Sequence, residues 1–186
     1  DFPHVTFVGV ILADIGLRLP DFRSSERTFQ LLTQFAGRAG RGTKPGRVYI
    51  QTYTPEHPSV LFAKEHDFLN FYRHEKTFRQ EFNYPPFCSL VNIIIRARDE
   101  KKAYAFAREV RDSLKKEFAE AIKSGMEIMG PAPLPFYKLR GHFRWHVMLK
   151  VPRTTTITPQ LYACLMSVKK PSAVAFALDV DPLNIL

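Results

Sequence analysis

The segment from Glu100 to about Lys123 constrains the fold most, because apolar residues recur there at helical spacing over many turns. One face of the expected helix carries Ala103, Ala107, Val110, Leu114 and either Phe118 or Ala121. Ser124 and Gly125 follow, and glycine commonly ends a helix. Since a long helix with one apolar face has to bury that face, the segments on either side of it decide the fold.

Strand-like segments flank this helix. In chain order the other expected elements are a strand at 90–95, a strand that begins at 127–129 and is interrupted at 130–135, a strand at 143–151, a short helix at 158–168 and a strand at 173–179. The order strand, helix, strand, strand, helix, strand is typical of the ferredoxin-like, or split βαβ, arrangement. That fold hosts many functions, so it predicts none by itself.

The first half of the chain alternates strand and helix with short loops. Residues 5–12 and 47–53 have strand patterns, and residues 25–40 between them form an amphipathic helix. This alternation is typical of a parallel α/β sheet, of which the chain holds the last portion. A charged stretch, expected as two helices, then runs until Asn83-Tyr84-Pro85-Pro86 breaks it. The sequence thus predicts an α/β chain in three parts: residues 1–56, a helical connector at 57–86, and an α+β domain at 87–186.

A short string at the end of the first long helix carries the clearest chemistry, Gln34-Phe35-Ala36-Gly37-Arg38-Ala39-Gly40-Arg41. Gln34, Arg38 and Arg41 are spaced at i, i+4 and i+7, so they share a face if the helix extends that far. The two glycines permit close approach of a ligand or another chain. Two guanidinium forks suit a nucleotide phosphate, and one of them can serve as an arginine finger. The alternative is a basic helix end followed by a turn, in which the arginines interact with the helix dipole.

Positive charge is concentrated in the second half. The net charge is +9, and there is no Asp or Glu from Ile128 to Leu178. The basic and aromatic residues of this acid-free stretch include Lys138, Arg140, Arg144, Lys150, Arg153, Lys169, Lys170, Phe136, Tyr137, Phe143 and Trp145. Because cations neutralise phosphates and aromatic rings stack on unpaired bases, the stretch predicts a nucleic-acid surface. The alternative places the aromatic rings in the core and the cations on a solvated face.

Several strings together resemble one family. Gln34 to Arg41 is similar to motif VI of superfamily-2 helicases, and the rest of the chain resembles the PriA family of bacterial replication-restart helicases, also called primosomal protein N′. The similar strings include Asp1-Phe2-Pro3-His4-Val5-Thr6, Leu19-Pro20-Asp21-Phe22-Arg23, Tyr84-Pro85-Pro86-Phe87, Gly130-Pro131-Ala132-Pro133, Leu139-Arg140-Gly141-His142-Phe143-Arg144-Trp145 and Asp179-Val180-Asp181-Pro182. The resemblance covers essentially the whole chain. It implies the last part of a RecA-like helicase lobe, followed by a ferredoxin-like βαββαβ C-terminal domain that binds DNA.

The resemblance also implies roles for single residues. Catalytic roles would fall to Gln34, Arg38 and Arg41, nucleotide contacts to Asp1, Gly37 and Gly40, and DNA contacts to Lys138, Arg140, Arg144, Trp145 and Lys150. Arg41 would be the arginine finger, Arg38 would also contact the phosphates, and Gln34 would link the nucleotide to the DNA path. No metal-binding residues are expected in this chain.

The chain lacks parts that a complete ATPase needs. It has no G-x-x-x-x-G-K-[ST] phosphate loop and no acidic pair placed after a strand to hold magnesium. We therefore expect this chain alone not to hydrolyse ATP. By resemblance, the parent protein would bind ATP and Mg²⁺, carry a zinc module that precedes this chain, and unwind DNA 3′ to 5′ at stalled forks. Its partners would be forked and single-stranded DNA, single-stranded-DNA-binding protein and other primosome proteins. The rival hypothesis is the lobe of an RNA helicase with an appended RNA-binding domain.

Other features are consistent with a bacterial cytoplasmic, nucleoid-associated protein. Cys88 and Cys164 lie far apart in apolar surroundings and are expected as buried free thiols. No membrane span or signal peptide is visible, and an opening on Asp1 without Met suggests a piece of a longer protein. The carboxylates Asp14, Asp21 and Glu26 lack metal-ligand spacing and are expected as structural partners of Arg23 and Arg27.

Overall fold

The chain divides into two compact units, Asp1–Arg79 and Gln80–Leu186. The computed structural model describes residues 5–37, 46–153 and 155–185. The division falls inside the segment 57–86, which the sequence predicts as a connector.

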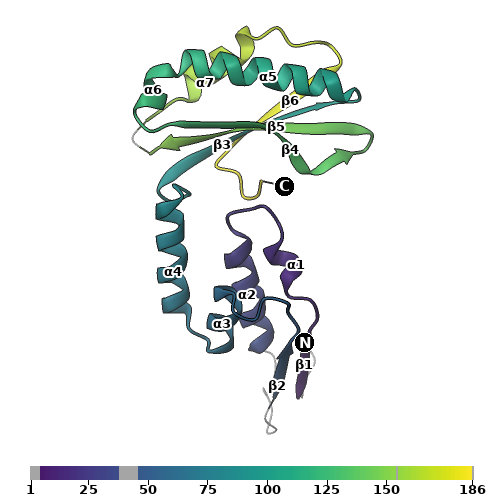
Figure 1. The fold of residues 1–186 in the computed structure, drawn as a ribbon, viewed down its shortest axis with the longest axis vertical. Helices are drawn as coiled ribbons and strands as arrows, with labels where there is room; N and C mark the ends of the chain where they lie inside the picture. Colours follow the sequence, from purple (N-terminus) through teal and green to yellow (C-terminus); the bar gives the residue numbers. More distant parts are fainter. Residues whose placement is uncertain (1–4, 38–45, 154, 186) are drawn as a thin grey trace. The chain divides into compact units, whose positions relative to one another are not determined.

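The first unit contains a two-stranded parallel sheet. β1 (Phe7–Val10) pairs in parallel with β2 (Arg47–Ile50), with Val8 opposite Val48. The helices of this unit are α1 (Asp14–Leu17), α2 (Ser24–Ala36), α3 (Pro58–Lys64) and α4 (Phe68–Glu81), of which α4 continues past the division (Figure 1). The parallel pairing and the two helices after β2 confirm the predicted pattern, whereas the sequence did not predict the short helix α1.

Three helices supply the core of the first unit. Phe29 and Leu32 of α2 pack with Val60 and Ala63 of α3 and with Phe71 of α4. The rings of Phe29 and Phe71 stack with their centroids 4.0 Å apart. Because Phe29 and Leu32 lie at i and i+3, the predicted apolar stripe of this helix is the face that the core buries.

Helix α2 ends at Ala36, earlier than the predicted residue 40. Gly37 is its C-cap, and the Gly37 N–H donates to the Thr33 carbonyl over 3.0 Å. Residues 38–45 lie outside the described residues. A common face for Gln34, Arg38 and Arg41 therefore stays a prediction.

The second unit is a four-stranded antiparallel sheet in the order β4-β5-β3-β6. Its strands are β3 (Cys88–Ala97), β4 (Glu127–Leu139), β5 (His142–Pro152) and β6 (Val174–Val180), and its helices are α5 (Glu100–Glu117), α6 (Ala119–Lys123) and α7 (Thr158–Ser167). All three helices lie on one side of the sheet (Figure 1). The predicted order of strands and helices is present, with α6 added.

The helices and one face of the sheet enclose the core of the second unit. On α5 the buried residues are Ala103, Phe106, Ala107, Val110 and Leu114, as its periodicity predicts apart from Phe106. On the sheet, Ile93 and Ile95 of β3 join this core with Val147 and Leu149 of β5. Because successive strand residues point to opposite faces, the remaining positions form a second face without helices, called here the helix-free face.

The single helix predicted at 100–123 is two helices. Phe118 stands between α5 and α6 with φ −101° and ψ 25°, outside the helical region. Its side chain is buried in the core, and its N–H still donates to the Leu114 carbonyl over 2.9 Å. The chain turns at Phe118 because burying this ring offsets the loss of regular helix geometry.

Strand β4 is continuous, so the predicted interruption at 130–135 was wrong. The register of β4 against β5 shifts between Met129 and Ala132 and again between Pro133 and Lys138. Gly130 has φ +97°, and a Cβ there would lie 2.7 Å from the His146 carbonyl oxygen, so only glycine fits. An edge strand tolerates prolines at such irregularities because one of its sides needs no hydrogen bonds.

Candidate nucleic-acid interface

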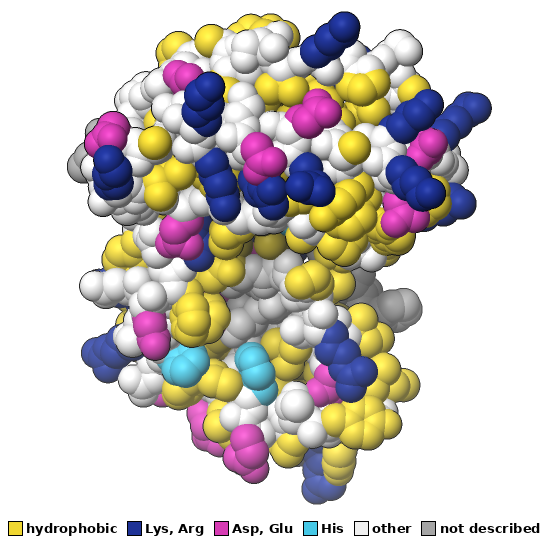
Figure 2. All heavy atoms as spheres, turned by 45° about the horizontal axis from the view of Figure 1, so that its top comes forward, with side chains coloured by type: hydrophobic (Ala, Val, Ile, Leu, Met, Phe, Trp, Pro, Cys, Tyr) yellow, Lys and Arg dark blue, Asp and Glu magenta, His cyan; other side chains and the backbone are white. Residues whose placement is uncertain are grey.

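The acid-free stretch 128–178 contributes to β4, β5, α7 and β6, so most of the sheet of the second unit is built without carboxylates. Figure 2, turned so that the helices of this unit come forward, shows Lys and Arg side chains interspersed with Asp and Glu. On α5, for example, Arg111 pairs with its neighbour Asp112 at 2.6 Å. The cations of α5 thus have carboxylates beside them on the same helix, whereas those of the stretch 128–178 have none near them in sequence.

The β4–β5 hairpin carries three of the predicted DNA-contacting residues. Arg140 occupies the turn with φ +50° and is exposed. The Lys138 ammonium lies 4.7 Å from the centroid of the Phe143 ring. Arg144 donates from Nη1 to the Phe136 carbonyl over 3.4 Å. Lys138 is opposite Phe143, and Arg144 is the next residue along β5, so the side chains of Lys138 and Arg144 start on opposite faces of the hairpin, with Arg140 in the turn between the strands.

Trp145, also predicted to contact DNA, is packed inside the unit. Its ring centroid is 4.7 Å from that of Tyr104 on α5 and 5.9 Å from that of Tyr137 on β4. The Tyr137 hydroxyl bonds to Glu100, and this bond raises the pKa of Tyr137 to about 12. Trp145 is half-buried in an aromatic cluster, so its position also fits the alternative that the sequence left open, a core role.

Lys150 was predicted to contact DNA, but the structure buries it, with 6% of its surface exposed. Its ammonium donates to the Phe82 carbonyl over 2.7 Å and lies 4.2 Å from the centroid of the Tyr84 ring. The Glu127 carboxylate is 3.8 Å away. Because these groups already surround the ammonium, Lys150 is a structural lysine that ties residues 82–84 to β5.

Arg96 was missed by the sequence analysis. It is an exposed residue of β3 that lies directly opposite Arg144 of β5. Arg96 precedes the acid-free stretch, and only the register of two strands distant in sequence brings it to Arg144. The only sequence signal was its place at the end of an apolar strand, on the same alternation as Ile94.

His146 lies two residues from Arg144 on the same face of β5. Its Nδ1 is 3.0 Å from the Asn92 amide oxygen, which can only accept, so Nδ1 carries the proton. Burial and then the nearby Arg144 charge lower the pKa of His146 below its ordinary value of 6.5. A neutral His146 leaves the arginines as the positive charges of this part of the sheet.

The predicted nucleotide-contacting residues belong to the first unit. Gln34 is exposed in the last turn of α2, and Gly37 ends that helix. Gly37 has φ −70°, so its backbone does not require glycine. Four further predicted residues lie outside the described residues: Asp1, Arg38, Gly40 and Arg41. Their roles stay predictions.

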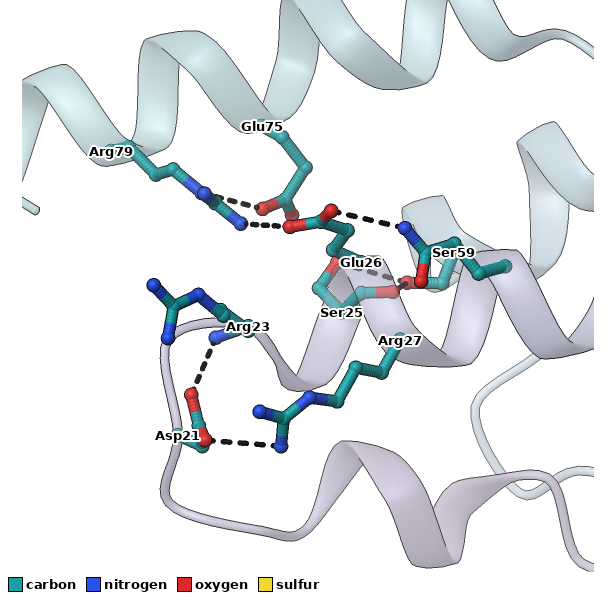
Figure 3. Close-up of polar contacts among 9 residues, drawn as sticks. Asp21, Arg23, Ser25, Glu26, Arg27, Ser59, Glu75 and Arg79 are labelled. Carbon is teal, nitrogen blue, oxygen red and sulfur yellow. Dashed lines mark hydrogen bonds and ion pairs between the residues drawn. The ribbon is translucent and has the colours of Figure 1, made fainter. Parts of the chain in front are cut away.

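Three carboxylates of the first unit, Asp21, Glu26 and Glu75, have arginine partners, as Figure 3 shows. Asp21 accepts from the Arg23 N–H at 2.9 Å and pairs with Arg27 at 3.1 Å, which confirms its predicted structural role. Glu26 pairs instead with Arg79 at 2.6 Å. Arg79 also lies 3.4 Å from Glu75, so it joins α2 to α4.

Contrary to the expectation, no arginine among the described residues pairs with Asp14. It accepts from the Thr54 hydroxyl at 2.6 Å, the Tyr53 N–H at 2.9 Å and the Thr52 hydroxyl at 2.9 Å. These bonds, the one from Thr54 first, hold the pKa of Asp14 far below its usual range. Asp14 thus fastens α1 to the residues that follow β2.

A pocket of about 200 Å³ lies beside this network in the first unit, with Asp21, Ser25, His57 and Glu75 in its wall. Burial lowers the pKa of His57, and the His57 Nδ1 accepts from the Ser59 N–H at 3.2 Å. Both carboxylates of this wall are paired with arginines, Asp21 with Arg27 and Glu75 with Arg79.

Both cysteines are buried free thiols, as predicted. The Cys88 thiol donates to the Asn83 carbonyl over 3.0 Å, and burial raises the pKa of Cys88 to about 11. Within the described ranges, no cluster of three His, Cys, Asp or Glu side chains is arranged to hold a metal ion. The helices that the structure describes include none with the length and apolar character needed to cross a bilayer.

Comparisons with known proteins identify relatives along the whole chain. Residues 80–183 match the family described as "Primosomal protein N C-terminal domain". The replication restart protein PriA of Bacillus subtilis (strain 168) is 40% identical over 185 residues, which are 98% of this chain and 22% of that protein. The PriA of Chlamydia pneumoniae is 36% identical over 184 residues, which are 99% of this chain and 24% of that protein.

The chain thus spans about a quarter of the length of these relatives. The matched residues 80–183 contain every strand and helix of the second unit. On the family match to this unit and the identity along the whole chain, the chain belongs to the PriA family of replication restart proteins.

Proposed function

We propose that this chain is part of a replication-restart helicase and that its second unit binds DNA at branched or stalled forks. The observation that carries the proposal is the acid-free hairpin, where Arg140 in the turn and Arg144 on β5 have no carboxylate partner among the described residues. Family membership makes DNA the expected polyanion. The element order and the strand order β4-β5-β3-β6 support a ferredoxin-like arrangement for this unit.

For the first unit, the proposal is the last part of a RecA-like lobe that supplies half of an ATP site. The parallel strands and an exposed Gln34 at the end of α2 support it. In the parent protein, Arg38 and Arg41 would stabilise the phosphates of ATP–Mg²⁺, with Arg41 as the arginine finger. The parent would unwind DNA 3′ to 5′ and carry zinc outside this chain. Single-stranded-DNA-binding protein and primosome proteins would be its partners in the bacterial cytoplasm.

The DNA-binding proposal is tested with one triple variant and a matched control. Lys138→Ala/Arg140→Ala/Arg144→Ala removes three positive charges from the hairpin. Lys101→Ala/Lys115→Ala/Lys116→Ala removes three from exposed positions of α5, where acidic residues are interspersed. Affinity for a labelled DNA fork is measured by anisotropy at several salt concentrations. Since each lost phosphate contact lowers the salt slope by about 0.7–0.9, the hairpin variant should lose about two units of slope and at least tenfold in affinity at 0.1 M salt.

Two outcomes would contradict the proposal. One is equal loss in the hairpin variant and the α5 variant, which would mean that total charge, and not the hairpin, governs binding. The other is stronger binding to RNA of the same sequence, which would favour an RNA-helicase lobe with an RNA-binding domain. Far-ultraviolet circular dichroism of each variant shows that the fold is retained.

A further inference from the structure

Two arginines lie opposite each other on neighbouring strands, and no counter-charge pairs with them in the part of the chain that the structure describes. Arg96 of β3 and Arg144 of β5 are direct partners in the antiparallel register. Directly opposite side chains in such a pair lie on the same face with Cβ atoms about 5 Å apart. Like charges at this spacing destabilise a sheet, so stabilising the fold does not account for this pair.

The nearest carboxylates in sequence are used elsewhere. Asp99 caps α5 by accepting from the Lys102 N–H at 3.2 Å, and Glu100 accepts from the Tyr137 hydroxyl. Among the described residues, no carboxylate pairs with Arg96 or Arg144, and the one hydrogen bond of Arg144 goes to the Phe136 carbonyl. Both guanidinium groups therefore keep donors for a ligand.

Acidic groups on the same face of the sheet lie at its other end. Asp179 of β6 is opposite Asn92, four residues along β3 from Arg96. At about 3.4 Å per residue the distance along β3 is about 14 Å, longer than the screening length of about 10 Å at 0.1 M salt. Glu127 lies 3.8 Å from Lys150, in the same region as Asp179. The helix-free face is thus polarised, with its positive end at the arginine pair.

From this geometry we infer that Arg96 and Arg144 together bind one phosphate group of the nucleic-acid backbone on the helix-free face of the sheet. Two guanidinium forks can bond several oxygens of one phosphate, which would remove the repulsion between them. Phe136 is next to this position, with 58% of its surface exposed and its carbonyl bonded to Arg144. The inference rests on the proposed DNA binding and adds Arg96 to the surface.

A double-mutant cycle tests the shared phosphate. Arg96→Ala and Arg144→Ala should each weaken DNA binding about tenfold, and the double variant should be little weaker than either, because the second arginine cannot hold the phosphate alone. Arg96→Lys keeps the charge but not the fork, so its affinity should fall between those of the wild type and Arg96→Ala. Arg98→Ala is the matched control, because Arg98 is exposed and lies just beyond the end of β3.

A second readout needs no DNA. Inorganic phosphate should raise the midpoint of thermal unfolding of the wild type more than that of Arg96→Ala. Unfolding is monitored by the fluorescence of Trp145, the chain's single tryptophan. Additive losses in the cycle, equal loss in Arg98→Ala, or the same phosphate response in both proteins would overturn the two-arginine site. If the hairpin triple variant loses DNA but Arg96→Ala does not, only this site fails. If the wild-type chain does not bind DNA, the proposed function itself fails.

Discussion

Replacing Lys150 by Met tests whether this lysine stabilises the fold or binds DNA. The change removes the 2.7 Å bond to the Phe82 carbonyl and the contact with the Tyr84 ring, while it keeps most of the buried volume. A hydrogen bond from a charged donor stabilises a fold by about 1.5–3 kcal/mol. The ring contact adds about 0.5–1 kcal/mol. The half-exposed Glu127 at 3.8 Å adds less than about 1 kcal/mol.

One effect opposes these losses, because Met does not have to be stripped of the water that a buried ammonium gives up. We therefore expect a net loss of about 2 kcal/mol in the free energy of unfolding of the second unit. Urea unfolding followed by Trp145 fluorescence measures this loss within that unit. Glu127→Gln, the matched control, should change the free energy by less than about 1 kcal/mol.

The role of Lys150 in DNA binding is measured with the same protein. In urea-free buffer Lys150→Met should keep the wild-type salt slope, because a structural lysine contacts no phosphate. The reasoning would be refuted by wild-type stability together with a salt slope lower by about 0.7–0.9, which is the signature of one lost phosphate contact.

Three further predictions follow from single groups. Gly37→Ala should stabilise the first unit by about 0.4–1 kcal/mol, because φ is −70° and, among the described residues, the nearest atom to an added Cβ is the Thr33 carbonyl oxygen at 3.6 Å; destabilisation in urea would contradict this. Cys88 should resist iodoacetamide at pH 8 in the folded chain and react after unfolding, because its pKa is about 11; mass spectrometry of the labelled peptide measures both. The folded chain should lose stability as pH falls below about 6.5, since the lowered pKa of His146 means that the unfolded chain binds more protons in the window down to the folded pKa. The free energy of unfolding, measured by Trp145 fluorescence at several pH values in that window, should depend less on pH in His146→Gln than in the wild type. An equal dependence on pH in the two proteins would refute the assignment of this effect to His146.

Periodicity correctly predicted those helices and strands whose buried side chains recur at regular spacing along the sequence. The buried face of α5 and the apolar strands at β3 and β5 are examples, because each residue's side follows from spacing alone. Irregular features were predicted poorly. The prolines of β4 looked like an interruption, although an edge strand can absorb them at register shifts. Phe118 looked like one more helical apolar position, although its own backbone breaks the helix.

For the candidate site, sequence spacing could not show which basic residues are exposed and which of them are neighbours. Lys150 is a basic residue in an acid-free stretch, which is typical of a nucleic-acid surface. Its structural role is visible only from the contacts of its ammonium with Phe82 and Tyr84. Arg96 lies outside the acid-free stretch, and only strand register makes it a neighbour of Arg144. The burial of Lys150 and the position of Arg96 both depend on contacts between segments distant in sequence, and local spacing does not encode such contacts.

Some basic residues of the acid-free stretch have partners inside the protein, so fewer of them are available to bind nucleic acid than the sequence suggests. Within the acid-free stretch, the Lys150 ammonium bonds to the Phe82 carbonyl and the Lys170 ammonium to the Val174 carbonyl, so both have a partner within the unit. Arg144 uses one long bond, and Arg140 projects from a turn. A phosphate gains most from donors that folding leaves unused, because no internal bond has to break on binding. Arg140 and Arg144, rather than Lys150 and Lys170, should therefore determine how tightly this sheet holds nucleic acid.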